Sequence, residues 1–316
     1  MPRVIHTGQA LVDATAQIPG LPSRGQNVMA GGWDQAAGGA VNILAAAARS
    51  GAQCVHAGTI GTGPNGDLVR AALAAEGVTW TADPVEDRDT ALCVVLVEPD
   101  GERTFVTMQG AERMLTVEAL ASSHPEPGDL VCLTGYSLAI ASTRDPLLAW
   151  LGTLPAGVEV VLDPGAVFAG LPGQIRARAL AVTTVWTSNQ EEASVLAGFD
   201  DFGNAAEAAE AVARLLPSRA VSLVRDGARG CAVRVGGRTT VVPGFPQRPV
   251  DTNGAGDAHT GVLVAERAVG TGWVEACLRA NVAGAITVTR LGPATSPTRA
   301  EIDAFLAARV PDSPHD

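Results

Sequence analysis

Short apolar runs alternate with alanine-rich segments along most of this chain, and this alternation constrains its fold more than any other feature. Apolar runs bounded by turn-forming residues predict strands, and longer alanine-rich segments predict helices. Their alternation is typical of crossover units, in which parallel strands form one sheet and helices cover both faces. The expected strands lie at residues 4–7, 55–60, 130–133, 159–162, 185–187 and 220–224, and the expected helices at 40–50, 65–76, 145–151, 191–196, 205–216, 256–269, 273–289 and 299–308.

Two segments break this alternation. Residues 13–34 are rich in Pro and Gly, and residues 90–109 contain two β-like runs, 91–97 and 104–108. Asp100-Gly101 between these runs is a hairpin signal. Together the two segments are expected to form a small β-rich lid on a central, mostly parallel sheet flanked by helices, which is an α/β fold. No internal repeat or long linker interrupts the chain, so we expect a single domain over residues 1–316.

Composition and charge exclude several classes of function. Apolar residues make up 47% of the chain and charged residues 17%, which allows a large core and argues against disorder. The net charge of −11 argues against nucleic acid as a partner, because phosphate binding needs a basic surface. No run approaches the roughly 20 apolar residues that span a bilayer, and no signal peptide is recognisable, so no membrane partner and a cytoplasmic location are expected. The five cysteines stand singly and are expected to be reduced thiols.

All 22 basic residues are Arg, and Lys is absent. A Walker-type phosphate loop and the usual protein-kinase site both need a Lys, as does Schiff-base chemistry. If the protein handles ATP, then backbone N–H groups, helix N-termini, Arg and Mg²⁺ must balance the phosphate charge.

The sequence Gly254-Ala255-Gly256-Asp257, followed by an apolar helical run, is the strongest chemical signal. Small residues let the backbone approach an anion, and the N-terminus of the following helix directs unpaired N–H groups and a positive dipole end towards it. An Asp at this position could accept a proton from a substrate hydroxyl during attack on a phosphate. The alternative is that Asp257 only caps the helix.

Several motifs in the same order resemble the ribokinase/PfkB family of carbohydrate kinases. The segment Asp251-Thr-Asn-Gly-Ala-Gly-Asp257 looks like the C-terminal signature of that family, and Gly38-Gly-Ala-Val-Asn42 looks like part of its N-terminal signature. Asn189-Gln-Glu-Glu192 is similar to the Asn-x-x-Glu motif of the family. The resemblance covers almost the whole chain and implies a ribokinase-like fold and ATP-dependent phosphorylation of a small sugar.

The resemblance also implies a role for each matching residue. Asp257 would be the catalytic base, with the backbone N–H groups of Gly254, Ala255 and Gly256 forming an anion hole. The acceptor sugar would bind to Asp13, Gly38, Gly39 and Asn42. ATP and Mg²⁺ would bind near Asn189, Glu192, Arg225, Gly227, Gly230 and Asn281.

For some of these residues the sequence leaves an alternative open. Asn189 and Glu192 could instead be an N-cap and the first turn of a helix. Arg225, which departs from the family pattern, could either approach ATP or point into solvent. The resemblance further implies a loop for a monovalent cation such as K⁺ near Asp251, Gly292 and Ser296.

The acceptor cannot be named from the sequence. The Gly-Gly segment is followed by Ala40-Val41 rather than by a Lys, which favours a neutral sugar over a sugar phosphate. A nucleoside is the alternative acceptor, with Trp33 as the candidate aromatic that stacks on its base. A sugar-binding regulator without catalysis is a further alternative. The lid leaves sheet edges that need cover, so a homodimer through the lid is expected.

Overall fold

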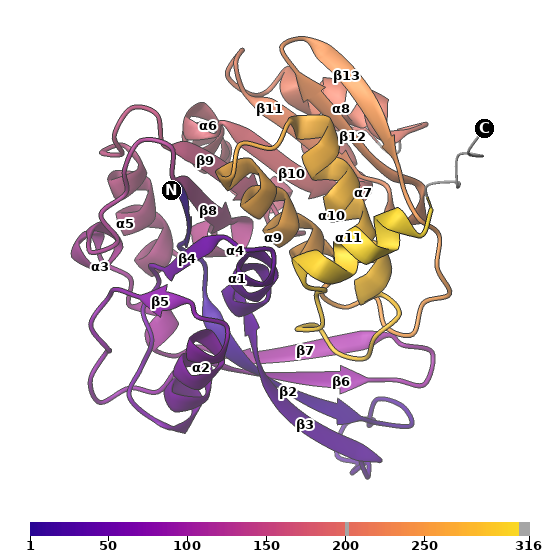
Figure 1. The fold of residues 1–316 in the computed structure, drawn as a ribbon. Coiled ribbons are helices and arrows are strands. Elements are labelled where there is room, and N and C mark those ends of the chain that lie inside the picture. Colours follow the sequence, from indigo (N-terminus) through magenta and orange to yellow (C-terminus); the bar gives the residue numbers. More distant parts are fainter. Residues whose placement is uncertain (200–201, 310–316) are drawn as a thin grey trace.

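Nine strands form the main sheet in the computed structural model, which describes residues 1–199 and 202–309. The strand order is β13-β12-β11-β10-β9-β8-β1-β4-β5, and all neighbours from β11 to β5 are parallel (Figure 1). Strands β12 and β13 add an antiparallel hairpin at one edge. The bounds are β1 Arg3–His6, β4 Gln53–His56, β5 Thr79–Trp80, β8 Leu130–Thr134, β9 Glu159–Asp163, β10 Val185–Asn189, β11 Val221–Arg225, β12 Gly230–Val235 and β13 Arg238–Pro243.

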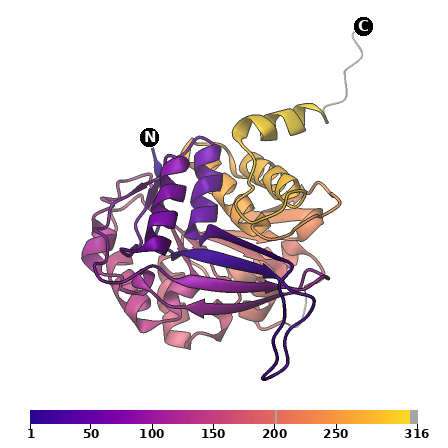
Figure 2. The same ribbon diagram turned by 90° about the horizontal axis from the view of Figure 1, so that it is seen from below.

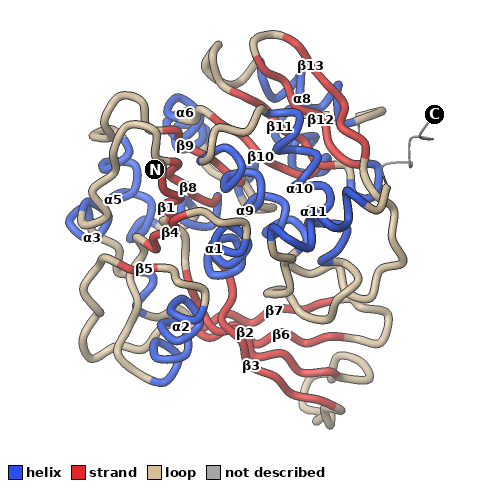
Figure 3. Tube along the Cα trace, viewed as in Figure 1, coloured by secondary structure: helices blue, strands red, loops and turns tan. Residues whose placement is uncertain are grey.

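Helices cover both faces of this sheet, as the tube in Figure 3 shows. On one face lie α1, α9 and α10, and on the other α5 to α8. The bounds are α1 Ala40–Arg49, α2 Pro64–Ala75, α3 Val117–Ala121, α4 Gly135–Leu138, α5 Ala141–Leu151, α6 Gly173–Val182, α7 Gln190–Ala197, α8 Ala205–Ala213, α9 Ala255–Ala268, α10 Trp273–Thr287 and α11 Arg299–Ala307, with short 3₁₀ turns η1 Ala111–Arg113, η2 Phe168–Gly170 and η3 Gly227–Arg229.

Adjacent residues of the central strands contribute to opposite cores. In β1, Val4 packs with the α1 and α9 side, whereas Ile5 packs with the α5 side, and both are completely buried. Because side chains alternate across a strand, a sheet with a core on each face needs apolar residues at consecutive positions. This explains the unbroken apolar runs, and the predicted α/β class with a mostly parallel sheet is confirmed.

A second sheet of four strands, in the order β3-β2-β6-β7, lies below the main body (Figures 1 and 2). We call it the lid sheet. Strands β6 and β7 pair antiparallel across the Asp100-Gly101 turn, as the hairpin signal predicted. The lid strands are β2 Ala10–Gln17, β3 Gly32–Gly39, β6 Leu92–Val97 and β7 Arg103–Met108.

Element bounds differ from the sequence expectation in several places, and helices α3, α4 and α6 were not expected. The first segment of the lid sheet, which contains β2 and β3, runs from Ala10 to Gly39 and is longer than the expected segment 13–34. The strand expected at 55–60 is Gln53–His56, and its apolar continuation is loop. The hairpin β12–β13 was not expected, because its apolar residues are interrupted by Arg and Gly in the sequence.

The remaining structural expectations concern cysteines and membranes. All five cysteines are buried and free of disulfides. In the described ranges no helix is both long and apolar enough to span a bilayer.

Candidate active site

The turn that begins α9 has the conformation expected of an anion-binding segment. Gly254 precedes the helix with a φ of 75°, which favours glycine. A Cβ added there would lie 2.2 Å from the carbonyl oxygen of Pro293, so a side chain is also excluded by contact. Ala255 and Gly256, in the first turn of this 14-residue helix, line a cavity, and the N–H of Ala255 makes a long hydrogen bond of 3.4 Å to the carbonyl oxygen of Thr252.

Asp257 lies in the first turn of α9, where its carboxylate is held in place by a residue from α1. Asn42 Nδ2 donates a hydrogen bond to Asp257 Oδ2 at 3.0 Å. Burial, followed by the nearby carboxylate of Asp163, raises the pKa of Asp257 to about 6, and the Asn42 hydrogen bond opposes this shift. A carboxylate with a raised pKa that is still largely ionised at neutral pH is suited to act as a general base.

Two cavities meet at this turn. The first, of about 440 Å³, is lined by Asp257 and by residues of the lid sheet, including Asp13, Gly39, Phe105 and Thr107. We call it the lid cavity. The second, of about 400 Å³, is lined by Ala255 and Gly256 and by residues of α10 and the β12–β13 side, including Gly227, Phe245, Asn281 and Ala285. We call it the α10 cavity. One helical turn therefore presents its carboxylate to one cavity and its backbone to the other.

Asp13 lies within the lid sheet rather than in a loop after β1, as its position in β2 shows. Burial raises the pKa of Asp13 to about 6. A Cβ on Gly38 would approach Asp13 Oδ2 to 2.1 Å, so the glycine leaves the space that the carboxylate occupies. Gly39 ends β3, and its φ of 63° turns the chain directly into α1, which carries Asn42.

Arg225 is largely buried between the two cavities, with its side chain 14% exposed. Its Nη1 donates to Thr187 Oγ1 and Thr260 Oγ1, each at 3.0 Å, and lies 3.3 Å from Asp163 Oδ2. Its Nη2 is 3.9 Å from Glu192 Oε2. Of the two alternatives left by the sequence, exposure to solvent is therefore excluded, and the guanidinium lies near Gly256 in the first turn of α9.

Asn189 and Glu192 form a complete capping box at the start of α7. Asn189 Oδ1 accepts from the N–H of Glu192 at 2.7 Å, and Glu192 Oε2 accepts from the N–H of Asn189 at 3.0 Å. The structural interpretation of these residues is thus borne out, and a part in metal binding remains a proposal. Burial and the Asp163 carboxylate raise the pKa of Glu192.

Other residues that were expected to bind the nucleotide lie along the α10 cavity. Gly227 and Asn281 line it. The amide Nδ2 of Asn281 donates to the carbonyl oxygens of Val242 and Pro243, and its Oδ1 lies 3.2 Å from His259 Nε2. Asn281 therefore fixes the end of β13 against α10. Gly230, the first residue of β12, has a φ of 105° and does not line this cavity.

Of the three residues expected to bind a monovalent cation, Asp251 and Gly292 are in contact and Ser296 is held by another residue. Asp251 Oδ2 accepts from the N–H of Gly292 at 3.0 Å, and Oδ1 accepts from the N–H of Asn253 at 2.9 Å. Oδ1 also pairs with Arg103 of lid strand β7. Ser296 lies elsewhere in the loop, where its carbonyl oxygen accepts from Arg49 at 2.9 Å.

Sequence reasoning missed two charged residues at the site, Asp163 and Arg113, and the contact of Arg103 with Asp251. Asp163 ends β9, next to the central strands. In open α/β sheets, ligands bind beyond the carboxyl ends of strands, so this position was a detectable signal. Arg113 follows the lid hairpin in η1, and nothing in the local pattern marks it.

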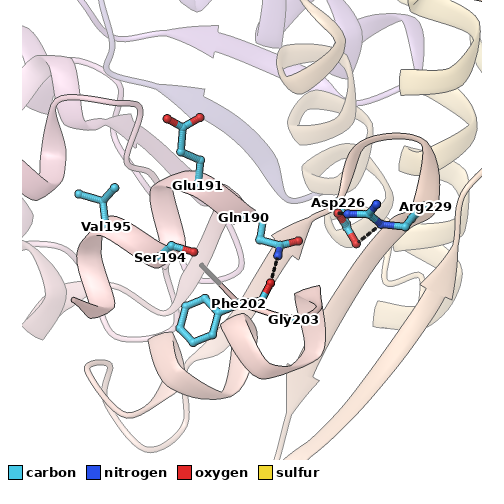
Figure 4. Close-up of a pocket in the computed structure, with 8 residues that line it drawn as sticks. All are labelled: Gln190, Glu191, Ser194, Val195, Phe202, Gly203, Asp226 and Arg229. Carbon is cyan, nitrogen blue, oxygen red and sulfur yellow. Dashed lines mark hydrogen bonds and ion pairs between the residues drawn. The ribbon is translucent and has the colours of Figure 1, made fainter. Parts of the chain in front are cut away.

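A further cavity, of about 410 Å³, lies beside α7 (Figure 4). Gln190 Nε2 donates to the carbonyl oxygen of Phe202 at its wall, and Arg229 pairs with Asp226. Of the predicted site residues, none lines it. The two cavities at the turn of α9 are therefore the candidate active site.

Comparisons with known proteins identify the family of the chain. Residues 1–300 match the family model described as pfkB family carbohydrate kinase. The chain is 32% identical over 312 residues to the uncharacterized sugar kinase YegV of Escherichia coli K12, covering 95% of this chain and 92% of that protein. It is 31% identical over 316 residues to the ATP-dependent ribose-1-phosphate kinase of Halopiger xanaduensis, covering 98% and 99%.

Among solved structures, the adenosine kinase from Sinorhizobium meliloti superposes with a TM-score of 0.81 at 21% identity, covering 97% of this chain and 99% of that one. This likeness concerns the fold, which is ribokinase-like. The family model spans nearly the whole chain, and its relatives are sugar kinases. The chain belongs to the pfkB family of carbohydrate kinases.

Proposed function

We propose that the protein transfers the γ-phosphoryl group of ATP to a hydroxyl of a small sugar bound in the lid cavity, with Asp257 as the general base. The observation that carries the proposal is the meeting of two cavities at the first turn of α9. Asp257 lines the lid cavity, where a hydroxyl could reach it, whereas Ala255 and Gly256 line the α10 cavity. The acceptor and the phosphate donor would thus approach the same turn from opposite sides.

In the proposed reaction, Asp257 accepts the proton of the acceptor hydroxyl. The hydroxyl oxygen forms a bond to the γ-phosphorus, and the bond from that phosphorus to the bridging oxygen breaks, which leaves ADP. The N–H groups of Gly254, Ala255 and Gly256 stabilise charge on the phosphoryl oxygens, because helix N-termini attract anions. Arg225 adds a positive charge beside them, in a chain that has no lysine.

The residues present fit a divalent cation that binds chiefly to phosphate and water. In the part of the chain that the structure describes, no group of three or more His, Cys, Asp or Glu is arranged to hold a metal ion alone. Mg²⁺ keeps several waters and is usually held by one or two carboxylates plus substrate phosphates. Glu192 and Asn189 would be the protein groups that hold Mg²⁺, and the ion would neutralise phosphate charge.

A monovalent cation such as K⁺ would bind near Asp251 and Gly292, with Ser296 as the third residue implied by the resemblance. The fit is incomplete, because both carboxylate oxygens of Asp251 already accept hydrogen bonds. The use of ATP agrees with the cytoplasmic location that the sequence suggested.

The first test is ADP release by Asp257→Asn with a panel of sugars. Loss of a general base is expected to lower kcat by roughly 10²- to 10⁴-fold. The KM for ATP should change little, because the α10 cavity is unaltered. Asp83→Asn, at an exposed position, is the matched control. Full turnover by Asp257→Asn would refute the assignment of the base.

A nucleoside is the second candidate acceptor. Trp33, the aromatic suggested by the sequence, is 60% exposed and does not line the lid cavity. Phe105 and Tyr136 do line it and would offer faces on which a base could stack. Greater kcat/KM for nucleosides than for sugars, reduced by Phe105→Ala, would favour this alternative. A regulator without catalysis would instead bind sugars and release no ADP.

We also propose a homodimer through the lid sheet. Its edge strands β3 and β7 have neighbours on one side only. Large apolar side chains are exposed there, with Trp33 at 60%, Val106 at 56% and Met108 at 53%. Exposed edges and apolar patches of this kind usually mark an interface. Light scattering should give twice the chain mass, and a monomer at micromolar concentration would contradict this.

A further inference from the structure

Arg113 enters the wall of the lid cavity from η1, directly after the lid hairpin. Its side chain is only 17% exposed. Arginine keeps its charge in proteins and presents a rigid fork of N–H donors. A guanidinium in this position is therefore a permanent positive charge at the cavity surface.

Two nitrogens of this guanidinium, Nε and Nη1, are buried and have no hydrogen-bond partner among the described residues. Glu112 forms an ion pair with this guanidinium, in which Oε1 lies 3.4 Å from Nε, beyond the length of a good hydrogen bond. Glu112 is already engaged, because Oε2 accepts from the N–H groups of Ala91 at 2.9 Å and Gly110 at 3.1 Å. Buried donors without a partner cost free energy. Because Arg113 lines the cavity, an anion that binds there would offset this cost.

The charges around the cavity divide into two groups. Asp13 and Asp257 form no ion pair and keep lone pairs that can accept from hydroxyls, although Asp257 Oδ2 already accepts from Asn42, whereas Asp163 is paired with Arg225. Among the lining residues, Arg113 has the one positive charge. A ligand that satisfies all of these groups needs hydroxyls for the carboxylates and an anionic group for the guanidinium.

We propose that the acceptor is an anionic polyol and that Arg113 binds its carboxylate or phosphate group. The inference rests on the proposed kinase function and replaces the neutral sugar that the Gly-Gly segment suggested. A carboxylate or phosphate matches the planar fork of Arg in two-pronged hydrogen bonding. A cavity of about 440 Å³ is within the range of small-molecule sites and has room for a derivative of a pentose or hexose.

The charge balance bears on which anion is bound. Three aspartates and one arginine line the cavity, so a dianionic phosphate would meet more repulsion than a monoanionic carboxylate. Sugar acids are therefore expected to be better acceptors than sugar phosphates. Both classes share the chemistry that Arg113 recognises, and the experiment separates them.

The test compares each neutral sugar with its aldonic acid and with its terminal phosphate. ADP release is measured with ribose, ribonate and ribose 5-phosphate, and with glucose, gluconate and glucose 6-phosphate. An anionic member of a set should have the higher kcat/KM. Arg113→Met should raise its KM by on the order of 10- to 100-fold, the value of a charged hydrogen bond, with little change in kcat or in the KM for ATP.

Two further variants distinguish binding from a structural role. Arg113→Lys keeps the charge without the fork and should recover part of the affinity, whereas Arg219→Gln, at an exposed position, should change nothing. The anionic acceptor should also raise the unfolding temperature of the wild-type protein without ATP, and this rise should be lost in Arg113→Met. The purely thermal readout remains valid if a variant turns over slowly.

Two results would overturn the inference: preference for the neutral sugars, or equal KM values for wild type and Arg113→Met with the anionic acceptor. Failure of the kinase function would look different. In that case the wild-type protein would release no ADP with any acceptor, while thermal stabilisation by the anionic compounds would still report on Arg113.

Discussion

Asp257 combines two conditions that a general base at neutral pH requires. Its carboxylate is fixed by the amide of Asn42, and burial raises its pKa to about 6. The neighbouring Asp163 raises the pKa further, while Arg225 opposes the shift. The alternative that Asp257 caps the helix does not hold, because the N-cap of α9 is Gly254 and no side chain makes a capping hydrogen bond there.

The pH dependence of kcat/KM should reveal this shift. Asp257 must be ionised to accept a proton, so activity should fall about tenfold per pH unit below pH about 6 and level off above it. Asp163→Asn removes a negative charge that raises the pKa of Asp257. The acidic limb of the pH profile of this variant should therefore move to lower pH. An acidic limb near pH 4 in the wild-type protein, the ordinary range of a carboxyl group, would contradict the prediction.

Arg113 and Asp163 illustrate what single residues add to the site. Asp163 follows a predicted strand, and the rule that places ligands at strand ends could have identified it. Arg113 has no such signal, because only the folded chain shows that its nitrogens are buried at a cavity without partners. The expected residues Asp13, Gly39 and Asp257 do line the same cavity.

At the scale of elements, an ion pair connects the lid sheet to the segment that precedes α9. Arg103 of β7 pairs with Asp251, three residues before Gly254. Arg103 is 22% exposed and Asp251 10%, so the pair is partly shielded from solvent. Because Phe105 and Thr107 of the same strand line the lid cavity, this contact joins the acceptor side to the turn of α9.

Loss of this ion pair should weaken the coupling between the two elements. Arg103→Gln is expected to lower kcat/KM roughly tenfold, because a partly buried charge is left without its partner. Arg24→Gln, at an exposed position in the lid, is the control. Steady-state kinetics with the best acceptor measures both. Equal kcat/KM for Arg103→Gln and wild type would show that the pair has no part in the reaction.

At the scale of the whole molecule, a buried histidine pair makes folding sensitive to acid. His6 and His56 end neighbouring strands β1 and β4, and both nitrogens of His56 have no hydrogen-bond partner within the described residues. Burial lowers the pKa of His56 to about 4 and that of His6, which also faces His56, to about 3. As pH falls below about 6.5 the unfolded chain binds these protons first, so stability is lost.

Asp13 and Asp257 act in the opposite direction, because their folded pKa values of about 6 exceed those of the unfolded chain. Between pH 6 and 4 the two effects partly cancel. His56→Leu should remove the contribution of one histidine. The slope of unfolding free energy against pH should then be smaller by about 1.4 kcal/mol per pH unit. Urea unfolding at pH 4.5 to 6.5 measures this, with His124→Gln at an exposed position as control. An unchanged slope would contradict the shift.

The sequence alone determined the α/β class, the hairpin at Asp100-Gly101, and the glycine turn that leads into Asp257. Apolar periodicity and turn residues report local conformation and burial, which are set by neighbours along the chain. The tertiary structure decided the pairing of Arg225 with Asp163, 62 positions away, and of Arg103 with Asp251, 148 positions away. Such contacts depend on strand order and lid placement, and no local pattern of residues encodes these.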